Sequence, residues 1–149
     1  MIELIVSNSS FLISLERINR LEILQKLFNE ILIPPAVHTE IGFSYSWLKI
    51  KEPKYVDFIS ALQTNLGLGE SEVIALAFEI KSKMILDDAQ ARKIAERFKL
   101  KIIGTIGILL LAKQERIITK VNPIIEELEH SGFYLSAHLK NPVITLSRE

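Results

Sequence analysis

The sequence contains no cysteine. Its absence excludes disulfide bonds, thiolate zinc sites and cysteine nucleophiles. Histidine is also scarce: His38, His130 and His138 are far apart and lack the spacing that would bring them to one metal ion. Each histidine is therefore expected to be a surface or capping residue. Any site in this chain has to be built mainly from other polar side chains.

Neither a surplus of one charge nor a long apolar run is present. Eighteen basic residues balance 18 acidic ones, so no overall positive field indicates a nucleic-acid partner. A metal ion in an acidic cleft could still meet phosphates locally. No run approaches the roughly 18 apolar residues of a membrane span, and no secretory signal begins the chain. We therefore expect a cytoplasmic protein without a membrane partner.

The remaining composition is that of a globular protein. The chain has 149 residues, of which 48% are hydrophobic and 24% charged, and residues 1–149 are expected to form a single domain with a sizeable core. Predicted strands alternate with predicted helices, which favours parallel βαβ units with right-handed crossovers. Strands are predicted at 2–6, 30–33, 48–51, 83–86 and 101–103, and helices at 11–18, 21–28, 35–41, 55–63, 70–80, 89–98, 106–113 and 122–131. The segment 135–146 is expected to be two short pieces or a kinked helix.

The stretch 66–105 carries acidic residues at the ends of its elements. In the helix predicted to start near Glu70, that residue shares a face with Val73 and Ile74, whereas Glu72 and Glu79 lie on the other, solvent-facing side. An inward carboxylate needs a donor, a cation or a proton. The alternative is an ordinary first-turn glutamate, which the helix dipole favours.

Two aspartates, Asp87 and Asp88, follow the strand predicted at 83–86. One of them suffices to cap the next helix, and the second exceeds that requirement. Likewise, the polar residues 7–10 follow the first strand and are typical of a helix N-cap. In parallel sheets the residues after each strand meet at one edge, where ligands bind. The side chains expected to meet there are Asn8, Glu40, Glu70, Asp87, Asp88 and Thr105.

Such a cleft has a clear chemical preference. Clustered carboxylates repel each other unless they are protonated or bridged by a cation. Oxygen ligands favour Mg²⁺ or Mn²⁺. A hard metal ion at this edge could activate water and hold a phosphodiester.

Several stretches, in this order, resemble the PIN-domain superfamily, and specifically the prokaryotic toxin-type (VapC-like) proteins of toxin–antitoxin pairs. Together they cover most of the chain: VSNSSFLISLERINRLEILQKLF, ILIPPAVHTEI, LGLGESEVIALAFE, ILDDAQARKIAERFKLKIIGTIGILLLAK and SGFYLSAHL.

The resemblance implies an α/β fold, a three-layer α/β/α sandwich with a mainly parallel central sheet, similar to flap nucleases. It also implies ribonuclease activity with Mg²⁺ or Mn²⁺, an RNA substrate, a small antitoxin partner and a homodimer. The metal-binding and catalytic positions carried over are Asn8, Glu40, Glu70, Asp87 and Asp88, with Asp87 and Asp88 not distinguished. Substrate contacts are expected at Ser9, Arg92, Lys93 and Thr105.

One position departs from the family pattern. Asn8 is neutral where the family usually has a metal-binding aspartate. An asparagine can donate a carbonyl oxygen to a hard cation, but with less charge. Two hypotheses follow: a metal-dependent endoribonuclease, or a degenerate module that binds nucleic acid or protein without catalysis. A third hypothesis is a receiver-like or nucleotide-binding α/β module. A receiver needs an aspartate after its third strand and a lysine after its fifth, whereas this sequence has Pro34-Pro35 and Gly104-Thr105 after the comparable strands, and it has no GxGxxG or Walker pattern.

Overall fold

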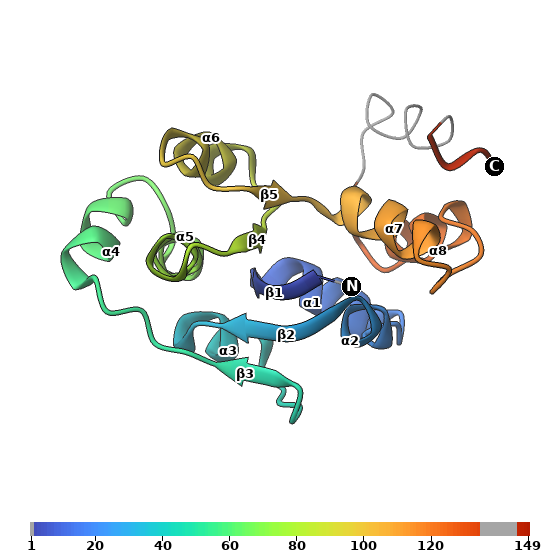
Figure 1. Ribbon diagram of the computed structural model, residues 1–149, viewed down its shortest axis with the longest axis horizontal. Helices are drawn as coiled ribbons and strands as arrows, with labels where there is room; N and C mark the ends of the chain where they lie inside the picture. Colours follow the sequence, from blue (N-terminus) through green and yellow to red (C-terminus); the bar gives the residue numbers. More distant parts are fainter. Residues whose placement is uncertain (1, 135–145) are drawn as a thin grey trace.

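The computed structural model of the protein describes residues 2–134 and 146–149 (Figure 1). The segment predicted at 135–146 therefore lies outside the described residues except for its last position. Within the described part of the chain, no helix is both long enough and apolar enough to cross a membrane.

Five parallel strands form the centre of the fold. Strand β1 (Ile2–Ser7) lies in the middle, between β2 (Phe28–Ile33) and β4 (Lys83–Ile85). Strand β3 (Leu48–Ile50) adds to β2, and β5 (Ile102–Ile103) adds to β4, which gives the order β3-β2-β1-β4-β5. Every neighbouring pair is parallel, as the alternation of strands and helices predicts.

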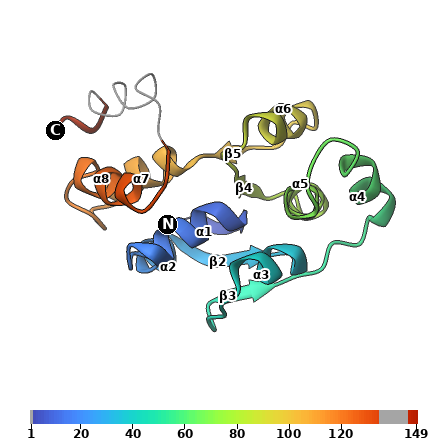
Figure 2. The ribbon, with the colours of Figure 1, turned by 180° about the vertical axis from the view of Figure 1, so that it is seen from behind.

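The winding direction reverses at β1. From β1 the chain moves outward to β2 and β3, and it then returns to β4 and β5 on the other side. Right-handed crossovers in opposite directions place helices on opposite faces of the sheet, and helices lie on both sides of the strands in Figures 1 and 2. The predicted three-layer α/β/α sandwich is confirmed. The helices are α1 (Ser9–Arg17), α2 (Glu22–Leu27), α3 (Pro35–Ile41), α4 (Val56–Leu62), α5 (Leu68–Ile80), α6 (Ala89–Arg97), α7 (Thr105–Gln114) and α8 (Asn122–His130).

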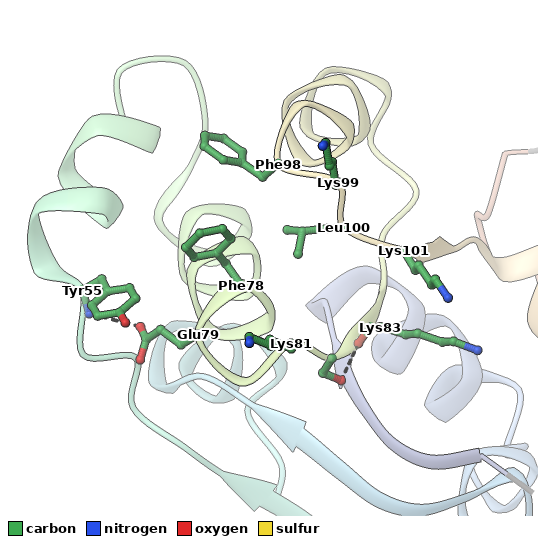
Figure 3. Close-up of a pocket in the computed structure, with 10 residues that line it drawn as sticks. Tyr55, Phe78, Glu79, Lys81, Lys83, Phe98, Lys99, Leu100 and Lys101 are labelled. Carbon is green, nitrogen blue, oxygen red and sulfur yellow. Dashed lines mark hydrogen bonds between the residues drawn. The ribbon is translucent and has the colours of Figure 1, made fainter.

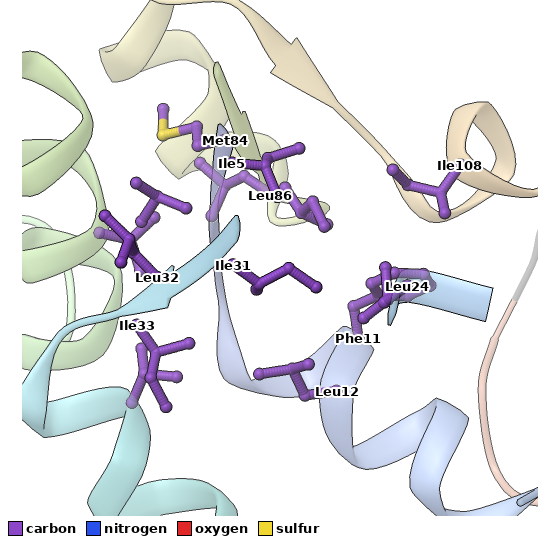
Figure 4. Close-up of a cluster of buried hydrophobic side chains, with 14 of the residues drawn as sticks. Ile5, Phe11, Leu12, Leu24, Ile31, Leu32, Ile33, Met84, Leu86 and Ile108 are labelled. Carbon is purple, nitrogen blue, oxygen red and sulfur yellow. The ribbon is translucent and has the colours of Figure 1, made fainter. Parts of the chain in front are cut away.

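The hydrophobic core joins the central strands to the helices that follow them (Figure 4). Ile5, Ile31 and Met84, from β1, β2 and β4, are at most 1% exposed. Phe11 and Leu12 of α1 are fully buried against this cluster. Each such side chain contributes about 1.5–3 kcal/mol through burial, so the core fixes the position of the strand ends.

The ends of α3 follow the sequence signals. Pro35 is the first residue of the helix, where its missing N–H has no intrahelical role. Gly42 ends the helix with φ 74°, in the left-handed region that glycine adopts without strain. This short helix carries Glu40 in its last turn.

Several predicted boundaries differ from the structure by one or two residues, and two of them concern residues of interest. Phe28 was expected to close a helix, but it begins β2, where it pairs with Ile2 of β1 and is 3% exposed. Helix α5 begins at Leu68 rather than near Glu70, and Gly69 lies inside it. For Phe28, the pairing with Ile2 on a distant strand overrides the local pattern.

Candidate metal-binding and active site

Asn8 follows β1 at the carboxyl edge of the sheet. It occupies the N-cap position of α1, yet its side chain makes no capping hydrogen bond, so the predicted capping role is wrong for this residue. Its Nδ2 donates to Ser10 Oγ at 3.0 Å, and its backbone N–H donates to Ile85 O of β4 at 3.3 Å. Its buried Oδ1 has no hydrogen-bond partner among the described residues. Burying an acceptor without a partner costs about 1–3 kcal/mol, which a ligand at this atom would offset.

Glu40 and Gly69 lie against each other. Glu40 comes from the end of α3, and Gly69 from the first turn of α5. A Cβ at Gly69 would collide with Glu40 Oε1. The second glycine of the LGLG stretch thus makes room for the carboxylate, a role that the sequence analysis did not predict.

Glu40 and Glu70 interact electrostatically. Partial burial raises the pKa of Glu40, and the nearby charges of Glu70 and, more weakly, Glu72 raise it further. A hydrogen bond from the Ser9 hydroxyl opposes the rise in this pKa. Two glutamates and a serine from α1, α3 and α5 are therefore gathered next to the end of β1.

Glu72 and Glu79 of α5 differ from their prediction. Both were expected to face solvent, but each accepts hydrogen bonds from a distant backbone segment. Glu72 Oε1 accepts from Ala36 N at 2.9 Å, at the start of α3. Glu79 accepts from Lys54 N at 2.8 Å and from Tyr55 N at 3.1 Å, just before α4. Glu72 thereby ties α3 to α5 and holds Glu40 near Glu70.

Asp87 and Asp88 have different roles. Asp88 Oδ2 accepts from Ala91 N at 2.8 Å and caps α6, as expected for one of the pair. Asp87 accepts from Thr105 at the start of α7: Oδ1 from the backbone N at 2.9 Å, and Oδ2 from Oγ1 at 2.5 Å. Thr105 is 1% exposed. Asp87 is thus the aspartate without a capping duty, and it joins the ends of β4 and β5.

Arg92 lies beside Asp87 at this edge. A Cβ at Gly104 would lie 3.0 Å from Asp87 Oδ1 and 3.5 Å from Arg92 Nη2, so both groups flank that glycine. Asp87 and Arg92 also line a cavity of about 420 Å³ beside Ile106. Lys93, the other predicted phosphate contact, is exposed on α6.

The predicted residues fall into two groups around the point where the winding reverses. Ser9, Glu40 and Glu70 form one group, and Asp87, Arg92 and Thr105 form the other. Asn8 follows β1 and is bonded to β4. Residues 2–134 and 146–149 contain no set of three or more acidic or histidine side chains arranged to hold one metal ion. Ligands of doubly wound sheets bind at this reversal point.

The fold and this edge define a doubly wound α/β domain with acidic and amide side chains beyond its central strands. The chain belongs to the PIN-domain family, since residues 4–149 match the model of a family described as PIN domain. The resemblance to the PIN-domain superfamily is thereby confirmed, and with it the membership of a nuclease-type superfamily.

No curated protein matches the chain. Among solved structures, the chain is similar to a PilT N-terminus domain protein from the hyperthermophilic archaeon Sulfolobus solfataricus P2. The two are 19% identical, the match covers 91% of this chain and 98% of that one, and the TM-score is 0.45.

Proposed function

We propose that the protein is a metal-dependent endoribonuclease of PIN type that acts in the cytoplasm as the toxin of a toxin–antitoxin pair. One observation carries the proposal: the buried Asn8 Oδ1 has no partner among the described residues, at the edge where Glu40 and Glu70 are gathered. A buried acceptor beside two repelling carboxylates suits a cation. The family and the sequence motifs support the toxin role, the small antitoxin partner and a homodimer.

The chemical types of the donors, rather than their arrangement, suit a hard divalent ion. Asn8, Glu40 and Glu70 offer an amide oxygen and two carboxylates, which Mg²⁺ and Mn²⁺ accept. Asp87 and Asp88 complete the proposed ligands; Asp88 uses Oδ2 for its cap. When bound, the ion would supply a more acidic water and charge stabilisation of the phosphodiester.

The other side chains position these groups. Thr105 fixes the orientation of the Asp87 carboxylate through two hydrogen bonds. The Ser9 hydroxyl donates to Glu40, and Glu72 holds the start of α3 against α5. Arg92, beside Asp87, offers a cation for a phosphate oxygen; Ser9, Lys93 and Thr105 are the further proposed substrate contacts.

Glu70→Gln tests the proposal. The purified protein should cleave single-stranded or structured RNA with Mn²⁺, and this substitution should stop cleavage. Glu126→Gln, on the exposed side of α8, removes the same charge far from the proposed ligands and should leave cleavage intact. The proposal fails if no RNA is cleaved with any divalent ion, or if Glu70→Gln cleaves as well as the parent.

A non-catalytic module is the second candidate. The neutral amide at Asn8 favours it, because an asparagine brings less charge to a cation than the aspartate usual in the family. Asn8→Asp separates the two candidates. If the parent is inactive and this variant cleaves RNA, the parent is a degenerate nuclease that keeps the fold for binding.

A further inference from the structure

A pocket lined by lysines and aromatic rings lies at the amino ends of the strands, on the side of the sheet away from the proposed active site (Figure 3). Its volume is about 480 Å³. It lies where α5 and α6 end and where β4 and β5 begin, whereas the proposed active site follows the other ends of the same strands. The proposed function uses none of its side chains.

Four lysines surround this pocket in a repeated pattern. Lys81 precedes β4 and Lys83 is its first residue. Lys99 and Lys101 hold the equivalent positions before β5. The two strands pair in parallel, and Met84 N donates to Lys101 O at 3.0 Å, so the two lysine pairs are brought together. In Figure 3, Lys83 and Lys101 both extend away from the aromatic rings, toward the same side of the view.

The four lysines of this pocket outnumber its one acidic lining residue, so the pocket keeps a net positive charge. Glu79 is the acidic residue in its lining, and its carboxylate is engaged by the backbone N–H groups of Lys54 and Tyr55. None of the ion pairs found in residues 2–134 and 146–149 involves the four lysines. A chain with zero net charge thus concentrates positive charge at one place, which favours a polyanion.

Aromatic rings form the other wall. Phe78 and Phe98 are 41% and 39% exposed, and Tyr55 is 53% exposed. The rings of Phe58, Phe78 and Phe98 contact one another edge to face, with centroids 5.0–5.9 Å apart. They are rigid, half-exposed rings beside a cluster of cations. Proteins bind single-stranded nucleic acid with this combination, because lysines meet phosphates and rings stack on bases.

We infer that this pocket binds a segment of single-stranded RNA at a distance from the catalytic edge. The choice of RNA rests on the proposed function; the charge and the rings alone indicate a single-stranded nucleic acid. Strand β4 is short, so Lys83 at the pocket lies about 13 Å from Asp87 at the proposed active site, measured along the strand. Strand β5 is the outermost strand of the sheet. No further strand of the described residues therefore covers the surface between the pocket and the proposed active site.

Binding of a fluorescein-labelled oligouridylate of about ten nucleotides, without divalent ions, tests the inference. The double variant Lys83→Gln/Lys101→Gln should weaken binding at least about tenfold at low salt. It should also reduce the slope of log K against log salt by about 1.4, since each phosphate contact on a single strand contributes about 0.7. The matched control Lys26→Gln/Lys120→Gln removes two exposed lysines elsewhere and should leave affinity and slope unchanged.

Phe98→Leu keeps an apolar side chain but removes a ring, and it should weaken binding about tenfold with the salt slope unchanged. Circular dichroism melting confirms that each variant is folded. Equal affinities of parent and lysine variant would overturn the inference, as would a polyglutamate that competes as well as the RNA. The binding assay does not depend on cleavage. If the pocket lysines are needed for RNA binding but the protein cleaves no RNA, only the proposed function is contradicted. If the protein cleaves RNA but binding does not depend on the pocket lysines, only this inference is contradicted.

Discussion

Asp87 and Thr105 are joined by two hydrogen bonds that link the end of β4 to the start of α7. The carboxylate accepts from the backbone N–H at 2.9 Å and from the hydroxyl at 2.5 Å. Thr105 is buried, and Asp87 is half-buried at the edge that holds the candidate site. This pair couples the stability of the domain to the placement of one proposed metal ligand.

Thr105→Val should lower the free energy of unfolding by about 1–2 kcal/mol. The substitution keeps the side-chain shape but removes a hydrogen bond to a charged acceptor. Urea unfolding measures the effect, and Thr119→Val, at an exposed position, is the control. Equal destabilisation by both variants would show that the hydroxyl of Thr105 has no special role.

Glu72→Ala should cost about 1 kcal/mol of stability, although alanine is the better helix former. The loss arises at α3, where Ala36 N would no longer have its acceptor. Thermal melting of this variant and of Glu126→Ala, exposed on α8, separates the lost contact from the gain in helix propensity. A Glu72→Ala variant as stable as Glu126→Ala would contradict the prediction.

Gly69→Ala should separate stability from function. The methyl group improves helix propensity by up to about 1 kcal/mol, so the domain should remain as stable or become more so. It also occupies the place of the Glu40 carboxylate, which must then move away. RNA cleavage should therefore fall while the melting temperature does not. Glu126→Ala, at an exposed position of α8, is the control for cleavage, and equal cleavage by both variants would refute the role of Gly69.

Glu40→Gln should stabilise the protein at neutral pH. The pKa of Glu40 is raised in the folded state, first by burial and then by Glu70, so the native state binds more protons than the unfolded state near this pKa. Stability is then lost as pH rises from about 4.5 through the folded pKa, and the variant avoids this loss. Melting temperatures from pH 4 to 8 should diverge toward higher pH, with Glu96→Gln on α6 as the control. A constant difference across this range would rule out the linkage.

Glu149 should contribute stability that is lost in acid. Burial raises the pKa of its carboxyl, but hydrogen bonds from Val121 N, Asn122 N and Lys113 outweigh burial and lower the pKa to about 2. The contribution is complete above about pH 4.5 and disappears as pH falls toward 2. Glu149→Gln should cost about 1 kcal/mol at pH 7, since charge-assisted hydrogen bonds are partly screened by solvent. Unfolding at pH 7 and pH 2.5 should show the difference between parent and variant shrinking in acid.

The fold could largely be predicted from the sequence because its signals are local. Pro35 and Gly42 delimit α3, and Asp88 caps α6, as their chemistry requires. The alternation of strands and helices was enough to predict the parallel sheet. Phe28 was assigned to the wrong element because its pairing with Ile2 is not visible in its own neighbourhood.

The candidate site could be predicted only in part. Asn8 and Asp87 could be placed at one edge because residues that follow parallel strands meet there. This reasoning did not show that Thr105 holds Asp87, or that Asn8 Oδ1 lacks a partner among the described residues. The backbone contacts of Glu72 and Glu79 join segments far apart in the chain, so a helical pattern shows only which side these residues occupy. The role of Gly69 could not be predicted from its own neighbourhood, because the carboxylate that it accommodates lies on another helix.

The pairing of β1 with β4 has a consequence for biosynthesis. Val6 pairs with Met84, and Asn8 donates to Ile85, so the first strand gains its second neighbour only after more than half of the chain has been made. Closing so long a loop delays folding. Thr105 then has to emerge before Asp87 is fixed. A ribosome-bound chain therefore cannot assemble this edge until the residues up to Thr105 have emerged.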